Sequence, residues 1–320
     1  MSSETDISKY FTGTHEVQKC HEGQCELDLH THLANCEKNP GHAGFVPINK
    51  LSVEQFPVGY HDNNLYELTK ALADLTVRIA VKFTSFDRPE FVPGTEYPYP
   101  FYDSRGQNSL RTGTGKVFHM KKYTEGMDEK YGAYRTCPCP ECDHSDTPSK
   151  VWWEIIVVTA RHVVYDSSEA RQSSCRLWFD EDNCPKFNIV GYKVNGTSFN
   201  EDWSDLVCVT HDLDLGDKLY GMWMRWDDLW FPVSDKYKSR RDVDKLTIIV
   251  SHPHGCSKQV SIGHWVHKQE VGRYGTRYTY TTCTCPGSSG AGVYRLGWLS
   301  CHPHSGTSSG GLNYSGTDQG

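Results

Sequence analysis

The segment Cys285-Pro-Gly-Ser-Ser-Gly290 contains a serine whose neighbours suit nucleophilic catalysis. A serine hydroxyl becomes a good nucleophile only when a nearby base takes its proton. It also needs backbone N–H donors directed at the oxyanion that forms during attack on a carbonyl. Gly287 lets the chain turn so that its own N–H and that of Ser289 point the same way. The sequence therefore indicates a nucleophile at Ser289 with an oxyanion hole made by Gly287 and Ser289, although a Gly-Ser-Ser-Gly segment is also an ordinary loop.

A base and an acid stand beside two apolar segments upstream of this serine. Val157-Val-Thr-Ala-Arg-His162 is an apolar segment that ends in a single histidine, which predicts an imidazole at the end of a strand. Asp205-Leu-Val-Cys-Val leads directly into a later apolar strand. An acid in this place can hold the histidine tautomer and stabilise the imidazolium. Asp212 is the alternative acid, but it follows the strand, so we assign the catalytic triad to His162, Asp205 and Ser289.

Together these segments resemble the trypsin-like serine protease superfamily. Thr159-Ala-Arg-His162 is similar to the Thr-Ala-x-His motif of that superfamily, and Asp205-Leu-Val-Cys-Val resembles its Asp-(Leu/Ile)-Ala-Leu-Leu strand. Gly287-Ser-Ser-Gly-Ala-Gly-Val293 is similar to its Gly-Asp-Ser-Gly-Gly-Pro-Val loop. Gly113-Thr-Gly115 and Ser251-His-Pro-His-Gly255 resemble the branch of HtrA-type, glutamyl-specific and viral proteases. The resemblance covers about residues 107 to 315. It implies a serine endopeptidase of chymotrypsin-like fold, with two six-stranded antiparallel β-barrels and a protein or peptide substrate.

The resemblance carries two further expectations. Ser288 stands where digestive trypsins have the aspartate that receives a newly cut N-terminus, so we expect no trypsin-style activation by cleavage. In glutamyl-specific and some viral proteases, a histidine before a Ser-Gly edge lines the first substrate pocket. His304 matches this place, and Ser305 and Gly306 follow it. A histidine there can bind a Glu or Gln side chain, with protonation favouring Glu; a loop histidine without a selective role is the alternative.

Cysteines and histidines gather in two segments outside the triad. Cys137, Cys139, Cys142 and His144 offer ligands that suit tetrahedral Zn²⁺. Some viral relatives in the family hold a structural zinc with a Cys-x-Cys pair, so we predict a structural zinc here; a disulfide is the alternative in an oxidising compartment. Catalysis itself needs no cofactor. A second group fits either zinc binding or an irregular segment: Cys20, His21, Cys25, His30, His32, Cys36 and His42.

The pattern of apolar residues predicts an all-β core with an N-terminal extension. Residues 1–104 form this extension, which holds the Cys/His-rich segment and one amphipathic helix. The helix is indicated by leucines and an isoleucine that step by three and four: Leu65, Leu68, Leu72, Leu75 and Ile79. After about residue 107, short β-rich runs alternate with turn residues. We therefore predict a first barrel at 105–215, an inter-barrel linker at 216–242 and a second barrel at 243–315.

Charge and hydropathy exclude two classes of partner. A net charge of −7 with no basic stripe does not suit a nucleic-acid backbone. No segment approaches the roughly 20 apolar residues of a membrane span, and the polar Met1–Tyr10 lacks the apolar core of a secretory signal.

With no export signal, the odd number of cysteines, 13, favours reduced thiols. We expect a cytoplasmic serine endopeptidase; a catalytically silent protease-like binding or scaffolding module is the alternative.

Overall fold

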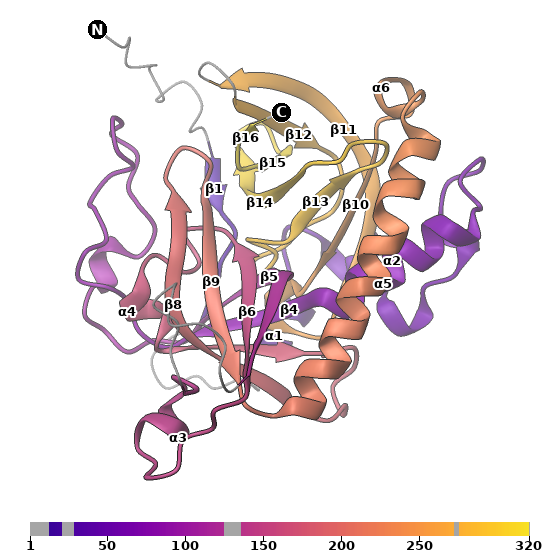
Figure 1. The fold of residues 1–320 in the computed structure, drawn as a ribbon. Coiled ribbons are helices and arrows are strands. Elements are labelled where there is room, and N and C mark those ends of the chain that lie inside the picture. Colours follow the sequence, from indigo (N-terminus) through magenta and orange to yellow (C-terminus); the bar gives the residue numbers. More distant parts are fainter. Residues whose placement is uncertain (1–12, 21–28, 125–135, 272–274, 320) are drawn as a thin grey trace, which may run out of the picture.

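Two closed antiparallel β-barrels form the core of the computed structural model, which describes residues 13–20, 29–124, 136–271 and 275–319 (Figure 1). In the first barrel, strand pairing runs in the order β5-β4-β7-β8-β9-β6 and closes through β6 and β5. Its strands are β4 (Thr76–Val81), β5 (Arg111–Tyr123), β6 (Trp152–Thr159), β7 (Ser173–Leu177), β8 (Phe187–Ser198) and β9 (Trp203–Thr210).

The second barrel pairs its strands in the order β12-β15-β14-β13-β10-β11 and closes through β11 and β12. Its strands are β10 (Leu246–Ser251), β11 (Gln259–Val271), β12 (Gly275–Tyr280), β13 (Gly292–Arg295), β14 (Cys301–Ser308) and β15 (Asn313–Ser315). Short strands add to the edges: β1 (Gly13–His15) on β14, β2 (Gln18–Lys19) on β5, β3 (Val46–Pro47) on β11 and β16 (Asp318–Gln319) on β12. The prediction of two six-stranded barrels is confirmed.

Six α-helices and several 3₁₀ turns connect the strands in the described residues. The helices are α1 (Leu29–Ala34), α2 (Asn63–Leu75), α3 (Pro140–Asp143), α4 (Ser167–Ala170), α5 (Leu213–Tyr237) and α6 (Arg241–Asp244). The 3₁₀ turns include η3 (Pro40–His42), η4 (Ile48–Lys50), η5 (Val53–Gln55), η6 (Tyr102–Ser104) and η8 (Pro253–Gly255). In this part of the chain, no helix has both the length and the apolar character that crossing a bilayer requires.

The first barrel begins earlier than the sequence predicts. Helix α2 forms as expected, with the Asp62 side chain accepting a hydrogen bond from the Asn64 N–H at its start. It ends at Leu75, however, and Ile79 belongs to β4, a strand of the first barrel in which every residue is buried. A continuous apolar run rich in β-branched residues suits a strand buried on both faces. Residues 76–81 therefore belong to the first barrel and not to the extension.

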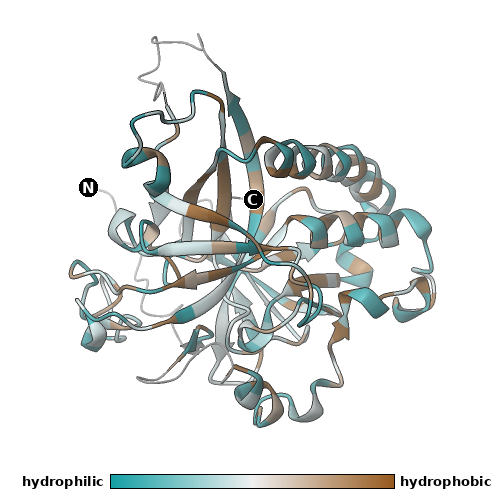
Figure 2. Cartoon of the chain, turned by 90° about the horizontal axis from the view of Figure 1, so that it is seen from below, coloured by the Kyte–Doolittle hydropathy of each residue, from teal (hydrophilic) through white to brown (hydrophobic). Residues whose placement is uncertain are grey.

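The predicted inter-barrel linker is mostly a helix. Helix α5 carries an interior Pro232 and a mixture of hydrophilic and hydrophobic residues, as Figure 2 shows for the two long helices. It packs against both barrels. Tyr220 lies 5.2 Å from the Trp153 ring of β6 between centroids, and Trp230 lies 5.4 Å from the Tyr294 ring of β13. These aromatic contacts join α5 to each barrel.

Candidate active site

Three loops from the two barrels bring a serine, a histidine and an aspartate together. His162 follows β6, and Ser289 lies in the loop between β12 and β13. The Nε2 atom of His162 is 2.7 Å from Ser289 Oγ, and its Nδ1 atom is 2.7 Å from Asp202 Oδ2. The backbone N–H of His162 donates to Asp202 Oδ1 at 3.2 Å. This is the geometry of a nucleophile, a general base and an acid that orients the base.

The acid beside His162 is Asp202, so the prediction that Asp205 occupies this place is wrong. Asp202 lies in the turn before β9 with a φ of 49°, a left-handed conformation that Asp tolerates better than most residues. Asp205 lies within β9, opposite Val158 of β6. Asp212, the alternative acid, caps helix α5 by accepting the Leu215 N–H. Asp205 and Asp212 lie within or just after β9, whereas the aspartate that contacts His162 is Asp202, in the turn before this strand.

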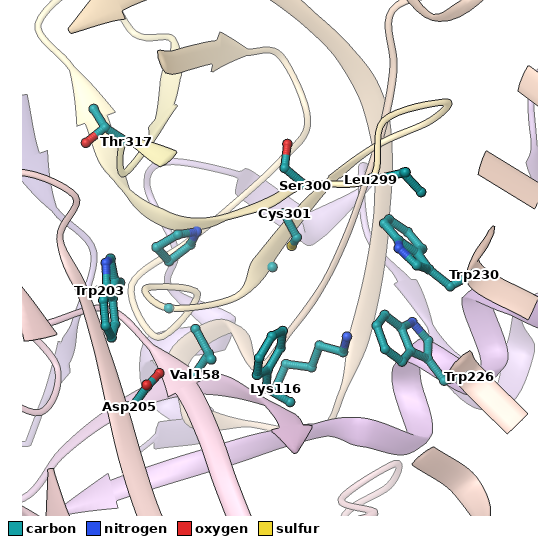
Figure 3. A pocket seen from close by; sticks show the side chains of 14 residues that line it. Lys116, Val158, Trp203, Asp205, Trp226, Trp230, Leu299, Ser300, Cys301 and Thr317 are labelled. Carbon is teal, nitrogen blue, oxygen red and sulfur yellow. The ribbon is translucent and has the colours of Figure 1, made fainter. Parts of the chain in front are cut away.

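Asp205 instead faces a separate cavity of about 450 Å³ between the barrels. Figure 3 shows its carboxyl group near Trp203, and Lys116, Trp226 and Trp230 at the same cavity. Burial raises the pKa of Asp205 to about 6 and lowers the pKa of Lys116 to about 7. The Lys116 ammonium lies 3.0 Å from the centroid of the Trp226 ring. This largely apolar cavity is not the site of the triad.

A buried ion-pair cluster supports the loop that carries His162. Glu169 is fully buried and binds Arg88 at 2.6 Å and Arg111 at 2.5 Å. Arg88 also donates to the carbonyl oxygen of His162 at 3.1 Å, and Arg111 donates to that of Val163 at 3.2 Å. The two guanidinium groups thereby fix the backbone that holds the imidazole.

Burial alone would disfavour the charged form of Asp202, but the charge and the hydrogen bond of His162 outweigh it and lower the pKa of Asp202 to about 2. Ser305 Oγ also donates to Asp202 Oδ2. The aspartate is therefore ionised at neutral pH and can stabilise a protonated His162.

Two backbone N–H groups beside Ser289 converge on one oxygen atom. The N–H groups of Gly287 and Ser289 donate to the carbonyl oxygen of Glu16 at 2.8 and 3.3 Å. Gly287 has a φ of 96°, and a Cβ atom there would lie 2.6 Å from the carbonyl oxygen of His252. Only glycine suits this place. The Ser288 side chain accepts the Cys285 N–H at 3.2 Å, so bonds inside the loop hold the two donors in position.

The oxygen that accepts these two N–H groups belongs to the segment of residues 13–19, which runs between the two barrels (β1 in Figure 1). Strand β1 pairs antiparallel with β14, with His15 opposite Gly306, and β2 pairs with β5. A Cβ atom at Gly306 would lie 2.0 Å from the carbonyl oxygen of Thr14, so a glycine is needed for β1 to approach. The same segment covers Ser289, whose Oγ accepts the Glu16 N–H at 3.1 Å and which is fully buried.

The Glu16 side chain lies in a polar pocket next to the Gly287 and Ser289 N–H groups. Its Oε2 atom is 2.7 Å from His304 Nε2, and its Oε1 atom accepts hydrogen bonds from Thr307 Oγ1, at 2.7 Å, and from Lys38 Nζ. Burial opposes ionisation of this carboxyl, but the hydrogen bonds and charges of His304 and Lys38 outweigh it and hold its pKa well below its usual range. The pocket therefore stabilises a carboxylate.

His304 binds this carboxylate through Nε2. An ionised carboxylate can only accept, so Nε2 must carry a proton. Nδ1 lies 2.6 Å from the Tyr280 hydroxyl, which can donate to it when the ring is neutral. Burial lowers the pKa of His304, and the bond to Glu16 opposes this in part. A neutral ring with its proton on Nε2 can therefore bind the carboxylate, so a glutamate does not require the protonated histidine expected from the sequence.

The structure brings His304, Ser305 and Gly306 together along the segment of residues 13–19. His304 contacts the Glu16 side chain, Gly306 pairs with His15, and the Ser305 carbonyl lies 3.3 Å from His15 Nδ1. The His15 ring lies against that of His162, with centroids 4.2 Å apart. Sequence reasoning missed Lys38 and Glu16, since nothing in their local sequence marks them as part of this cleft.

The first predicted metal cluster forms with a different fourth residue. Cys137, Cys139 and Cys142 lie with His211, and their potential ligand atoms are all within 4.8 Å of one another. His211 Nδ1 is 3.3 Å from Cys139 Sγ and 3.5 Å from Cys142 Sγ. His144 is exposed and outside this group, which corrects its assignment as a ligand. The residue after β9 reaches the cluster because β9 pairs with β6, next to the Cys-rich loop. These four residues could hold a metal ion.

The second Cys/His-rich segment contributes to a cluster that the sequence did not predict. Cys36 and His42 lie with His254 and Cys285 of the second barrel, and these four could also hold a metal ion. Among the other residues of that segment, His21 and Cys25 lie outside the described residues, and Cys20, His30 and His32 are not in this group.

No protein-family model matches the chain, and neither does any curated protein. Among solved structures, it is similar to the HtrA-type protease AlgW with a decapeptide, at a TM-score of 0.41 and 12% identity, over 78% of this chain and 63% of that chain. It is similar to Deg5 at a TM-score of 0.41 and 13% identity, over 79% of this chain and 88% of the Deg5 chain. It is similar to the inactive form of the Rv3671c protease at a TM-score of 0.37 and 12% identity, over 78% of this chain and 86% of that chain. The chain spans less than two thirds of the AlgW chain, and the strand pairing described above, not these similarities, establishes the two barrels.

Proposed function

We propose that this protein is a serine endopeptidase that cleaves peptide bonds after glutamate. The observation that carries the proposal is the convergence of two groups on one backbone carbonyl. A serine hydroxyl in contact with a histidine–aspartate pair lies on one side of it, and the Gly287 and Ser289 N–H groups bind its oxygen. A general base, an ionised acid and an oxyanion hole are the parts that acyl transfer requires.

In the proposed mechanism, Ser289 Oγ attacks the carbonyl carbon while His162 Nε2 takes its proton. Asp202 stabilises the resulting imidazolium through its bond to Nδ1. The negative charge that develops on the carbonyl oxygen is held by the N–H groups of Gly287 and Ser289. When the C–N bond breaks, His162 returns the proton to the leaving amine. Water, deprotonated by His162, then hydrolyses the ester on Ser289 and regenerates the enzyme.

Preference for glutamate follows from the pocket beside the oxyanion hole. His304 Nε2–H, Thr307 and Lys38 supply donors to both oxygens of the Glu16 carboxylate. A glutamine would place an NH₂ group against at least one of these donors. A small apolar side chain would leave the buried His304 donor unpaired, at a cost of roughly 1–3 kcal/mol. We therefore propose Glu over Gln, and both over apolar residues.

The activity is tested with a fluorophosphonate probe and with a quenched fluorescent peptide of the sequence Gly-Thr-His-Glu-Val-Gln-Lys. Wild type should be labelled and should cut the peptide after Glu. Ser289→Ala should lose both activities, whereas Ser309→Ala, a change of an exposed serine, should retain them. Peptide hydrolysis that survives in Ser289→Ala would refute the assignment of the nucleophile. If correctly folded wild type is neither labelled nor active, a silent binding module is the better description.

We also propose a structural zinc at Cys137, Cys139, Cys142 and His211. Three thiolates and one imidazole are a common ligand set for closed, tetrahedral zinc sites. The Nδ1 atom of His211 faces the thiols, while its Nε2 atom lies 3.6 Å from Glu141 Oε2, the kind of partner that orients a metal-binding histidine. Zinc content measured by mass spectrometry should fall by one ion per chain in Cys139→Ser and stay unchanged in Cys184→Ser. An unchanged content in Cys139→Ser would exclude this site.

A further inference from the structure

We infer that residues 13–19 are the enzyme's own substrate and that the chain cuts itself, within one molecule, between Glu16 and Val17. This inference rests on the proposed function and adds a specific bond to it. The first support is the path of the backbone. On one side of Glu16, Thr14 and His15 pair antiparallel with Thr307 and Gly306. On the other side, Gln18 and Lys19 pair with β5 of the first barrel.

The segment is therefore held on both sides of the bond between Glu16 and Val17, by the second barrel before it and by the first barrel after it. A bound cleavage product would have contacts on only one side of the broken bond. Contacts on both sides are what an endopeptidase makes with an uncut chain, because they keep the scissile bond in place during attack. Pairing of extended backbone with the edges of the cleft also works for almost any sequence, so the side chain at position 16 must provide the selection.

The second support is the position of the Glu16 carbonyl group. Its oxygen accepts both oxyanion-hole N–H groups, at 2.8 and 3.3 Å. Its amide nitrogen lies 3.1 Å from Ser289 Oγ. The carbonyl carbon is separated from that nitrogen only by the α-carbon, so it lies beside the nucleophile with its oxygen already polarised. The hydroxyl is at the same time 2.7 Å from the base that would take its proton.

The third support is the Glu16 side chain. Glu16 is the only acidic residue among residues 13–19. Its carboxylate enters the pocket of His304, and the residue is 5% exposed. A buried carboxylate without partners would be costly. Here every oxygen has a partner, and Lys38 also donates to Thr284 and Asn313 around the same pocket. Glu16 thus meets the requirement that the pocket sets for any substrate.

The proposed reaction forms a bond between Ser289 Oγ and the Glu16 carbonyl carbon and breaks the bond between that carbon and Val17 N. The Ser289 proton passes through His162 to the Val17 nitrogen, which becomes a new α-amino group. Water then adds to the ester, giving a free Glu16 carboxylate and restoring the serine. Until the segment leaves, it covers Ser289, so the uncut chain should process itself before it acts on other peptides.

The experiment compares the full chain, the Ser289→Ala variant and Glu16→Ala after expression, by intact mass and N-terminal sequencing. Wild type should begin at Val17, and Ser289→Ala should keep its original N-terminus. Glu16→Ala should slow processing at this bond at least tenfold. The exposed change Glu90→Ala is the matched control and should leave processing unchanged. For a preparation refolded from denaturant, the first-order rate should not change over a hundredfold range of dilution.

Two outcomes separate this inference from the proposed function. If wild type retains residues 1–16 yet cuts the heptapeptide Gly-Thr-His-Glu-Val-Gln-Lys in solution, the enzyme is a glutamyl endopeptidase and the self-cleavage is refuted. A processing rate that rises in proportion to concentration would refute cleavage within one molecule. If a folded wild type cuts neither its own chain nor the peptide, the proposed function itself fails.

A separate observation supports a second site. We propose that Cys36, His42, His254 and Cys285 bind one zinc ion behind the oxyanion loop. Cys36 Sγ lies 3.6 Å from Cys285 Sγ, and Cys285 Sγ lies 3.5 Å from His42 Nε2. In a tetrahedral site, Zn–S and Zn–N bonds of about 2.3 and 2.0 Å place two sulfurs about 3.8 Å apart and a sulfur and a nitrogen about 3.5 Å apart. A disulfide would bring the two sulfurs to about 2.05 Å.

His254 provides the independent evidence for a ligand. It is 4% exposed, and its Nε2 atom has no hydrogen-bond partner among the described residues. Its Nδ1 atom lies 2.9 Å from Gln18 Oε1, an acceptor that fixes the proton on Nδ1 and leaves Nε2 free to bind a metal. A buried ring nitrogen that is free to bind a metal, next to two thiols and a second imidazole, completes a set of four tetrahedral ligands.

This zinc site would position Lys38, a residue of the glutamate pocket. Lys38 lies between the ligands Cys36 and His42, and Asn39 beside it donates to Cys285 Sγ at 3.1 Å. Cys285 in turn begins the loop that carries Gly287 and Ser289. The ion would therefore tie the segment that supplies Lys38 to the loop that forms the oxyanion hole.

The test uses the Ser289→Ala full chain, so that the N-terminal segment stays in place, and measures bound Zn²⁺ per chain. Cys36→Ser and His42→Ala should each lose one ion per chain relative to this parent, and Cys184→Ser should lose none. Refolding with Co²⁺ should give the visible absorption of a tetrahedral thiolate site, reduced by Cys36→Ser. Full zinc content in both Cys36→Ser and His42→Ala would overturn the proposal, and so would a Co²⁺ spectrum that Cys36→Ser leaves unchanged.

Discussion

The two aspartates before and within β9 offer a matched pair of substitutions, Asp202→Asn and Asp205→Asn. Both change one carboxylate to an amide of the same shape, three residues apart. The structure assigns only Asp202 to His162, through bonds of 2.7 Å to Nδ1 and 3.2 Å to the backbone N–H. We therefore expect opposite results from two chemically identical changes.

The expected loss in Asp202→Asn follows from its hydrogen bonds. If the amide oxygen of the new Asn faces His162 Nδ1, its NH₂ group faces the His162 backbone N–H, and two donors oppose each other. If the NH₂ group faces Nδ1 instead, Nδ1 must accept and the ring proton moves to Nε2. The imidazole then cannot take the proton of Ser289. The wrong tautomer in a triad lowers kcat by about 10⁴-fold, or about 5 kcal/mol at 1.36 kcal/mol per tenfold change.

Asp205→Asn should change kcat less than about threefold, because the Asp205 side chain faces the cavity shown in Figure 3. The assay is kcat and kcat/KM on the quenched heptapeptide Gly-Thr-His-Glu-Val-Gln-Lys, with circular dichroism to confirm that both variants fold. If Asp205→Asn loses activity by the larger factor while Asp202→Asn keeps more than a tenth, the arrangement of the triad described here is incorrect.

Three further predictions follow from the same structure. His304→Ala should lower kcat/KM for a Glu peptide by about 30-fold or more, since truncating one partner of a buried pair costs at least about 2 kcal/mol. The kcat/KM for a peptide with Ala in place of Glu should change little. Equal losses of kcat/KM on both peptides would contradict the assignment of the pocket. Glu169→Gln leaves two buried guanidinium groups without their carboxylate and should lower the free energy of unfolding by about 3–5 kcal/mol in urea titrations. The control Glu67→Gln, in an exposed ion pair, should lower it by less than about 1 kcal/mol. Similar losses in the two variants would show that the buried cluster does not stabilise the loop. Because burial raises the pKa of Asp205 to about 6 from an ordinary value of 3.8, the wild type loses stability as pH rises from about 4 to 6. Asp205→Asn should therefore have the higher Tm at pH 7.5 and a difference near zero at pH 4, and a difference that does not vary with pH would refute the shift.

The sequence by itself determined the elements whose signals are local. The step of three and four along residues 65–75 is enough for α2, because an amphipathic helix needs only its own face pattern and a cap such as Asp62. The strands that hold the site follow from short β-branched runs between turn residues. His162, Gly287 and Ser289 stand out because each chemical role demands one residue type in one local backbone shape. The prediction of two barrels came from the resemblance of these segments to a known family.

Only the tertiary structure decided which distant groups meet. Asp202 and Asp205 both precede apolar residues of β9, and the choice between them depends on which one reaches a loop of another strand. His211 replaces His144 in the cysteine cluster because sheet pairing brings the end of β9 to that loop. Glu16 and Lys38 enter the cleft from a part of the chain with no local pattern of its own. Such contacts join groups far apart in sequence, and their positions depend on the packing of both barrels, which no local pattern of residues encodes.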